Sequence, residues 1–210
     1  MTATGAATRP RLALPTARLA RLHAVGRGIP GGLVMLVVCA VGLRVVLYWA
    51  TPGSDGARPL PLLFEALAAS VVGMMFRSPF GEVERVTGRW LPVLRFAAVV
   101  ALTALAFGSL VAGSAGARLD LGYAGLARDL VGLIGVALIT ATAFGGLLSW
   151  LGPVAFWLLS LYAIGSNWTT PWVFTDRRPA DTGAWLCTAA VFAAGTLLVT
   201  AFGARDGLHE

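Results

Sequence analysis

The sequence contains no lysine and few other reactive side chains. Without lysine it has no Gly-x-x-x-x-Gly-Lys-Ser/Thr phosphate-binding loop, so any ATP hydrolysis would take place on another polypeptide. The two histidines, His23 and His209, lie on terminal segments, and the two cysteines, Cys39 and Cys187, lie inside apolar runs. Neither a metal-ligand spacing nor a nucleophile motif is present. We therefore expect no cofactor and no enzymatic activity in this chain.

Charged residues are also scarce, at 12% of the sequence, whereas 57% are hydrophobic and the mean hydropathy is +0.78. Such a composition is too apolar for an ordinary soluble surface. A helix of roughly 20 apolar residues crosses a hydrocarbon core about 30 Å thick. Six apolar stretches of about this length lie near 30–50, 60–76, 93–113, 130–150, 153–173 and 184–202. The sequence predicts an all-α, polytopic membrane protein with six transmembrane helices.

The arginines are distributed unevenly over the connections between these stretches. Ten lie on the side that holds both termini, five lie on the other side, and Arg44 lies within a span. Because arginine-rich short loops stay cytoplasmic, we expect cytoplasmic N- and C-termini. The net charge of +6 then suits anionic lipid rather than nucleic acid. The predicted organisation is a cytoplasmic arm over 1–28, a membrane domain over 29–203 and a tail over 204–210.

The arm contains a candidate amphipathic helix over 15–25. Leu19, Leu22 and Val25 fall on one helical face with arginines beside them, which is typical of a helix lying in the cytoplasmic interface. The alternative is a charged flank that only sets the orientation of the first span.

Two charges fall inside the first two spans, Arg44 and Glu65. Both are expected at similar depth near the outer side, so they are candidates for an intramembrane ion pair. A role in a substrate or ion pathway, or simple snorkelling of Arg44 to the interface, are the alternatives.

The connection over 77–95 is the most polar one inside the chain. Glu82, Glu84 and Arg85 alternate with valines in a short predicted helix near 80–88, and Arg89 follows. This mixed charge on the cytoplasmic side indicates either a docking surface for a partner or a solvated connector.

The fifth span is interrupted after Ile164 by a polar segment that contains Asn167, Trp168, Pro171 and Trp172. Freed backbone groups at membrane depth must be satisfied by protein, which favours a broken or re-entrant segment. A helix that ends at an outer aromatic belt is the alternative. Arg128 and Asp129, at the outer end of the fourth span, are candidates for a local pair.

The layout resembles the membrane subunits of type-2 ABC exporters, in six spans, cytoplasmic termini, the basic helix at 15–25, the helix at 80–88 and the broken segment at 165–174. The stretches at 82–89 and 126–135 are similar to actinobacterial membrane proteins of such transporters. The resemblance implies a permease in the bacterial cytoplasmic membrane that pairs with a like or related subunit. It also implies two ATP-binding cassette ATPase subunits as partners, with Glu82, Glu84, Arg85 and Arg89 at the contact.

An amphipathic or lipidic substrate is expected, since the spans are aromatic and aliphatic with few charges. The alternatives are a non-transporting accessory or scaffold subunit, and a lipid-modifying enzyme. The enzyme would have to use the sparse polar residues of the spans: Arg44, Glu65, Ser70, Thr140 and Thr142.

Overall fold

The structure is a computed structural model that describes residues 29–49, 59–76, 91–117, 119, 121–166 and 173–203. Its six α-helices are α2 (Ile29–Trp49), α3 (Pro59–Met75), α5 (Leu91–Ser114), α6 (Gly122–Phe144), α7 (Leu151–Gly165) and α8 (Thr182–Phe202), with 3-10 turns η1 (Gly146–Leu148) and η2 (Phe174–Asp176). The predicted interfacial helix at 15–25, the helix at 80–88 and the tail at 204–210 lie outside the described residues. The all-α polytopic membrane fold is confirmed for the described part of the chain.

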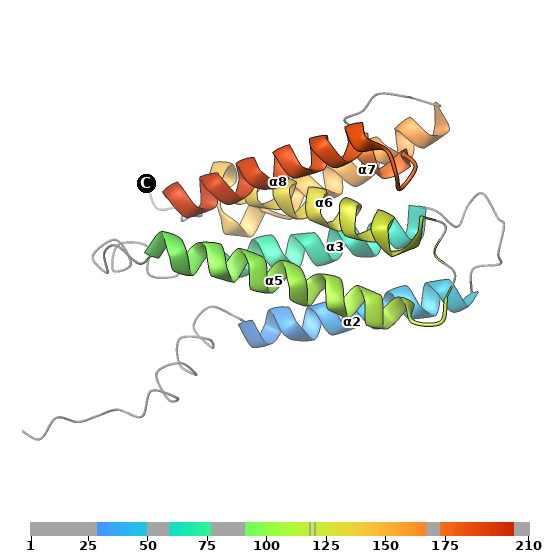
Figure 1. Cartoon of the computed structure of the whole chain (residues 1–210). Helices are drawn as coiled ribbons and strands as arrows, with labels where there is room; N and C mark the ends of the chain where they lie inside the picture. The colour runs from blue at the N-terminus through green and yellow to red at the C-terminus, as the bar shows by residue number, and fades with distance from the viewer. Residues whose placement is uncertain are drawn as a thin grey trace, which may run out of the picture.

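Five of the described apolar stretches are long enough to cross a membrane, and α3 is shorter. The 17 residues of α3 still extend about 26 Å, close to the thickness of a hydrocarbon core. Successive helices run in alternating directions, so that α2, α5 and α7 point one way and α3, α6 and α8 the other (Figure 1). The connections at 115–121 and 173–181 therefore lie at one end of the bundle, which the arginine distribution assigns to the outside. The connection at 145–150 lies at the opposite end.

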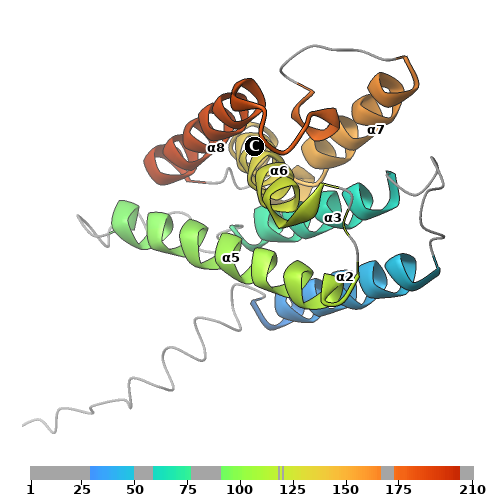
Figure 2. The same cartoon turned by 45° about the vertical axis from the view of Figure 1, so that its right-hand side comes forward.

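Helix α6 is the central element. It packs against α3, α5, α7 and α8 (Figure 2), and 67% of its most apolar stretch is buried, against 17–28% in the other four long spans. Its tightest contact is with α8, where Gly135 faces the backbone of Phe192 and Gly195 faces the carbonyl oxygen of Gly135. A Cβ on Gly195 would lie 2.5 Å from that oxygen. Glycine is thus what allows the two backbones to approach in lipid, where apolar surface alone does not drive helices together.

The predicted boundaries hold to within about two residues for four spans. The fifth, expected near 153–173, ends as a helix at Gly165, and the fourth is displaced as a whole. We expected it near 130–150, whereas α6 begins at Gly122 and ends at Phe144. Gly145 stops it with a φ of 92° and donates its N–H to the Ala141 oxygen. The chain then makes η1 and re-enters the bundle as α7. The prediction starts the span after Arg128 and Asp129 because these residues are charged. In the structure both lie in the second turn of α6.

Candidate functional site

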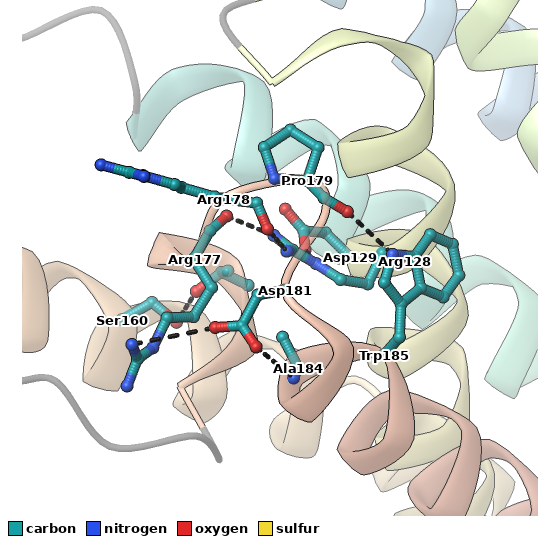
Figure 3. Close-up of polar contacts among 10 residues, drawn as sticks. Arg128, Asp129, Ser160, Arg177, Arg178, Pro179, Asp181, Ala184 and Trp185 are labelled. Carbon is teal, nitrogen blue, oxygen red and sulfur yellow. Dashed lines mark hydrogen bonds and ion pairs between the residues drawn. The ribbon is translucent and has the colours of Figure 1, made fainter.

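Arg128 is the largest fully buried side chain of the described residues, with 0% exposure. Its Nε donates to Oδ1 of Asp129 at 2.9 Å, which confirms the predicted local pair. Its Nη1 donates to the Arg178 carbonyl at 2.9 Å and its Nη2 to the Arg177 carbonyl at 3.1 Å (Figure 3). One guanidinium therefore fastens α6 to a loop that lies about fifty residues further along the chain. A planar fork of donors suits this task better than an ammonium group would.

The loop that Arg128 holds is folded into the bundle rather than laid over it. Val173 and Phe174 are each 1% exposed, and Thr175 is 6% exposed. The Phe174 ring stacks on Phe156 of α7 with 4.7 Å between ring centroids. The opposite edge of the Phe174 ring lies against Gly132 of α6, where there is no room for a Cβ. The segment after α7 thus packs as a wedge between α6 and α7.

Hydrogen bonds complete the attachment of this segment. Thr175 Oγ1 donates to Ser160 Oγ of α7 at 2.9 Å, within buried surroundings. Asp181 caps α8 by accepting the N–H groups of Gly183 at 2.9 Å and Ala184 at 3.4 Å. On the same side, Trp185 Nε1 donates to the Pro179 carbonyl at 2.8 Å (Figure 3). The loop therefore has side-chain contacts with three helices at the outer end, and we call residues 173–178, held in this way, the outer wedge.

The wedge bears directly on the broken fifth span. Helix α7 has only 15 residues, about 22 Å, and it ends at Gly165 before the polar segment begins. Together with η1 it reaches a span of 18 residues, Gly146–Ala163. The burial of Val173, Phe174 and Thr175 favours a segment that returns into protein over a helix that ends at an aromatic belt. Asn167, Trp168, Pro171 and Trp172 themselves lie outside the described residues.

Glu65 of α3 is the third buried acidic or basic side chain of the described residues, after Arg128 and Asp129. It is 6% exposed, and its Oε2 has no hydrogen-bond partner among the described residues. The charged groups that act on it are Asp129 and Arg128 of α6. The site therefore gathers two carboxyl groups and one guanidinium, and the guanidinium is already committed to Asp129 and to the outer wedge.

The predicted pair between Arg44 and Glu65 is not formed in this structure. Arg44 is exposed, and its Nη1 donates to the carbonyl of Ala115, directly after the last turn of α5. A cation is stabilised there by the negative end of the helix dipole and by unpaired terminal carbonyls. The two side chains face different elements: Arg44 turns toward the end of α5, and Glu65 turns toward α6.

The other polar candidates within the spans bond locally. Ser70 Oγ donates to the Ala66 carbonyl at 2.7 Å, and Thr142 Oγ1 donates to the Ile139 carbonyl at 2.8 Å. Thr140 has close carbonyl acceptors on its own helix and also lies 2.9 Å from the Ser149 carbonyl in the turn before α7. Each of these three hydroxyl groups is therefore bonded to a backbone carbonyl of its own helix.

The proposed contacts with an ATPase, Glu82, Glu84, Arg85 and Arg89, lie outside the described residues. Within the described part of the chain, no group of histidine, cysteine, aspartate and glutamate side chains is arranged to hold a metal ion. Cys39 and Cys187 are not bonded to each other. Comparisons with protein families, curated proteins and solved structures find no match.

Proposed function

We propose that this protein is the permease subunit of a type-2 ABC exporter in the bacterial cytoplasmic membrane. In this proposal it pairs with a second copy or a related permease and receives its energy from separate ATP-binding cassette subunits. The observation that carries the proposal is the outer wedge, because a six-helix bundle with a broken segment between its fifth and sixth spans is the feature that the resemblance implies. The absence of lysine, which removes any phosphate-binding loop, supports a division of labour with an ATPase chain.

The structure also supplies elements that a transport cycle would need. The outer wedge is held by hydrogen bonds that Arg128 donates to it and by the bond that Thr175 donates to Ser160, and none of these bonds involves the close glycine contact between α6 and α8. Release of the wedge would open the outer end of the bundle. In the proposed cycle, ATP-driven movement at 80–88 on the cytoplasmic side is transmitted along α3 and α5, and the outer end responds.

An amphipathic or lipidic molecule is the proposed substrate class. Large apolar side chains are exposed along α2, including Val34, Val37 and Val41, and along α5, including Leu94 and Phe96. Such faces are in contact with lipid in a membrane, so an apolar substrate could approach from the bilayer rather than from water. The few charges in the spans disfavour a strongly hydrated solute.

The first experiment is a low-salt purification of the tagged protein in detergent, with identification of the chains that co-purify. A stoichiometric ATPase subunit supports the exporter. The triple variant Glu82→Ala, Glu84→Ala, Arg85→Ala should then lower permease-dependent ATPase stimulation while leaving membrane insertion intact. Arg178→Ala is the matched control, because it removes an exposed charge at the opposite end of the bundle and keeps the backbone carbonyl that Arg128 uses.

The alternative function is that of a non-transporting accessory subunit. It is favoured by the full commitment of Arg128 to partners within the chain, which makes the outer site look structural. Retention of a different membrane protein, with no ATPase chain in the purified complex, would decide for this function. Equal ATPase stimulation by the wild type and the triple variant would remove the segment at 80–88 from the proposed mechanism.

A further inference from the structure

Glu65 is a buried acid that forms no ion pair with another described residue. Its side chain is 6% exposed, and Oε2 meets no donor among the described residues. The natural partner, Arg128, instead donates to Asp129 and to the carbonyls of Arg177 and Arg178. A buried carboxylate oxygen that meets no hydrogen-bond donor disfavours the ionised form, and such groups become neutral instead.

The helices that pack against α3 offer no substitute for Arg128. The only charged residue of α2 is Arg44, which is bound to the Ala115 carbonyl. The only charged residue of α5 is Arg95, which lies beside Gly203 at the opposite end of the bundle. Neither α7 nor η1 contains a charged residue.

The remaining ionisable groups on these helices point elsewhere. Tyr48 of α2, Tyr123 of α6 and Tyr162 of α7 are exposed, and Cys39 of α2 is buried in the apolar core. Among the described residues, the charges that act on Glu65 are those of Asp129 and Arg128. With both acids ionised, these three groups would carry a net charge of −1.

We propose that Glu65 is a proton-binding site, and that its bound proton keeps Arg128 on the outer wedge. A proton needs one oxygen atom and no cavity, which fits a carboxyl packed between α3 and α6. Protonation also turns Glu65 from an acceptor into a hydrogen-bond donor, with the Asp129 carboxylate as the nearby acceptor. This inference rests on the contacts of Glu65 and Arg128 and not on the proposed export function.

Loss of the proton would change the partner that Arg128 prefers. A guanidinium binds a carboxylate more strongly than it binds a neutral carbonyl. An ionised Glu65 would therefore draw Arg128 away from the Arg177 and Arg178 carbonyls, and the outer wedge would lose its link to α6. The proton balance is simple: the carboxyl releases one proton toward the outer end and takes one up when the wedge closes again.

Infrared spectroscopy of the full-length protein in lipid tests the proton site. The wild type should show a neutral carboxylic acid band at neutral pH that shifts in D2O and disappears as the pH is raised. The band should be absent in Glu65→Gln. Asp129→Asn removes the negative charge beside Glu65, so this variant should keep the band and lose it at a lower pH than the wild type. Absence of the band from the wild type, its failure to titrate, or its loss in Asp129→Asn with persistence in Glu65→Gln would each overturn the proposal.

Hydrogen–deuterium exchange tests the link to the outer wedge. After correction for intrinsic exchange rates, amides at 173–178 should lose protection over the pH range in which the carboxyl band disappears. Glu65→Gln mimics the protonated acid and should keep them protected throughout. The connection at Gly146–Leu148, on the opposite end, is the internal control and should not respond. Protection at 173–178 that stays constant while the band titrates would refute the link, and the wild type alone suffices for this comparison.

Discussion

Replacement of Arg128 by methionine should destabilise the protein far more than loss of any surface charge. Methionine keeps the length and most of the volume of the side chain, so the change removes charge and donors without leaving a large cavity. Arg128→Met leaves the Asp129 carboxylate, whose side chain is 4% exposed, without its partner. It also leaves the carbonyls of Arg177 and Arg178 without their donor.

The magnitude follows from these losses. Removal of one partner from a buried ion pair costs about 3–5 kcal/mol, because the other charge stays buried and uncompensated. Removal of one partner from an exposed ion pair costs only about 0–1 kcal/mol. Arg177 and Asp181, 3.8 Å apart and about 30% exposed, form such a pair and provide the comparison. We therefore expect about 3–5 kcal/mol for Arg128→Met and below about 1 kcal/mol for Arg177→Ala, whose backbone carbonyl remains.

The assay is equilibrium unfolding in mixed micelles, followed by tryptophan fluorescence. A second variant, Arg128→Met with Asp129→Leu, separates the buried charge from the lost packing. Replacement of both partners of a buried pair by apolar side chains removes the stranded charge, so the double variant should be more stable than Arg128→Met alone. Arg128 does not hold the wedge as described if the free energy of unfolding of Arg128→Met lies within about 1 kcal/mol of the wild-type value. The same conclusion follows if the double variant is less stable than the single one.

Three further predictions test other parts of the bundle. Gly195→Ala should destabilise by about 1–3 kcal/mol, because its methyl group meets the α6 backbone, whereas Gly108→Ala, with nothing within 4 Å, should be neutral or stabilising in the same assay. Asp181→Ala should cost about 0.5–2 kcal/mol by uncapping α8, and Asp181→Ser should recover most of that loss. Ala180→Cys should react with a membrane-impermeant maleimide in intact cells and Leu147→Cys should not; the reverse pattern would invert the predicted orientation.

The number and approximate place of the described helices could be predicted from the sequence, because a run of about 20 apolar residues is typical of a membrane-spanning helix. The boundary of α6 could not be predicted from apolar length. Arg128 and Asp129 look like residues outside a membrane, yet they lie in its second turn. Arg128 is buried because it binds the carbonyls of Arg177 and Arg178. A contact between residues about fifty positions apart cannot be predicted from the local sequence pattern.

The intramembrane charges show the same limit in another form. The sequence gives the position of Arg44 and Glu65 along their helices, but not the neighbouring helix that each side chain faces. Arg44 finds the end of α5, and Glu65 finds α6. The broken fifth span was more accessible to sequence reasoning, since a polar segment with proline cannot continue an apolar helix in lipid. Its return into the bundle depends on the fit of Phe174 against Gly132 and Phe156.

The bundle therefore separates what holds it together from what can change. Helices α6 and α8 meet through the backbones of Gly135 and Gly195, which carry no titratable side chain. At the opposite end of the bundle, Ser149 Oγ donates a hydrogen bond to the Gly146 carbonyl at 2.8 Å and closes the turn η1. The buried acidic and basic side chains of the described residues, Arg128, Asp129 and Glu65, lie at the outer end, where Arg128 binds both Asp129 and the outer wedge. A change of partner by Arg128 could thus free residues 173–178 while the glycine contact of α6 with α8 stays closed, which is the arrangement that a gate at the outer end requires.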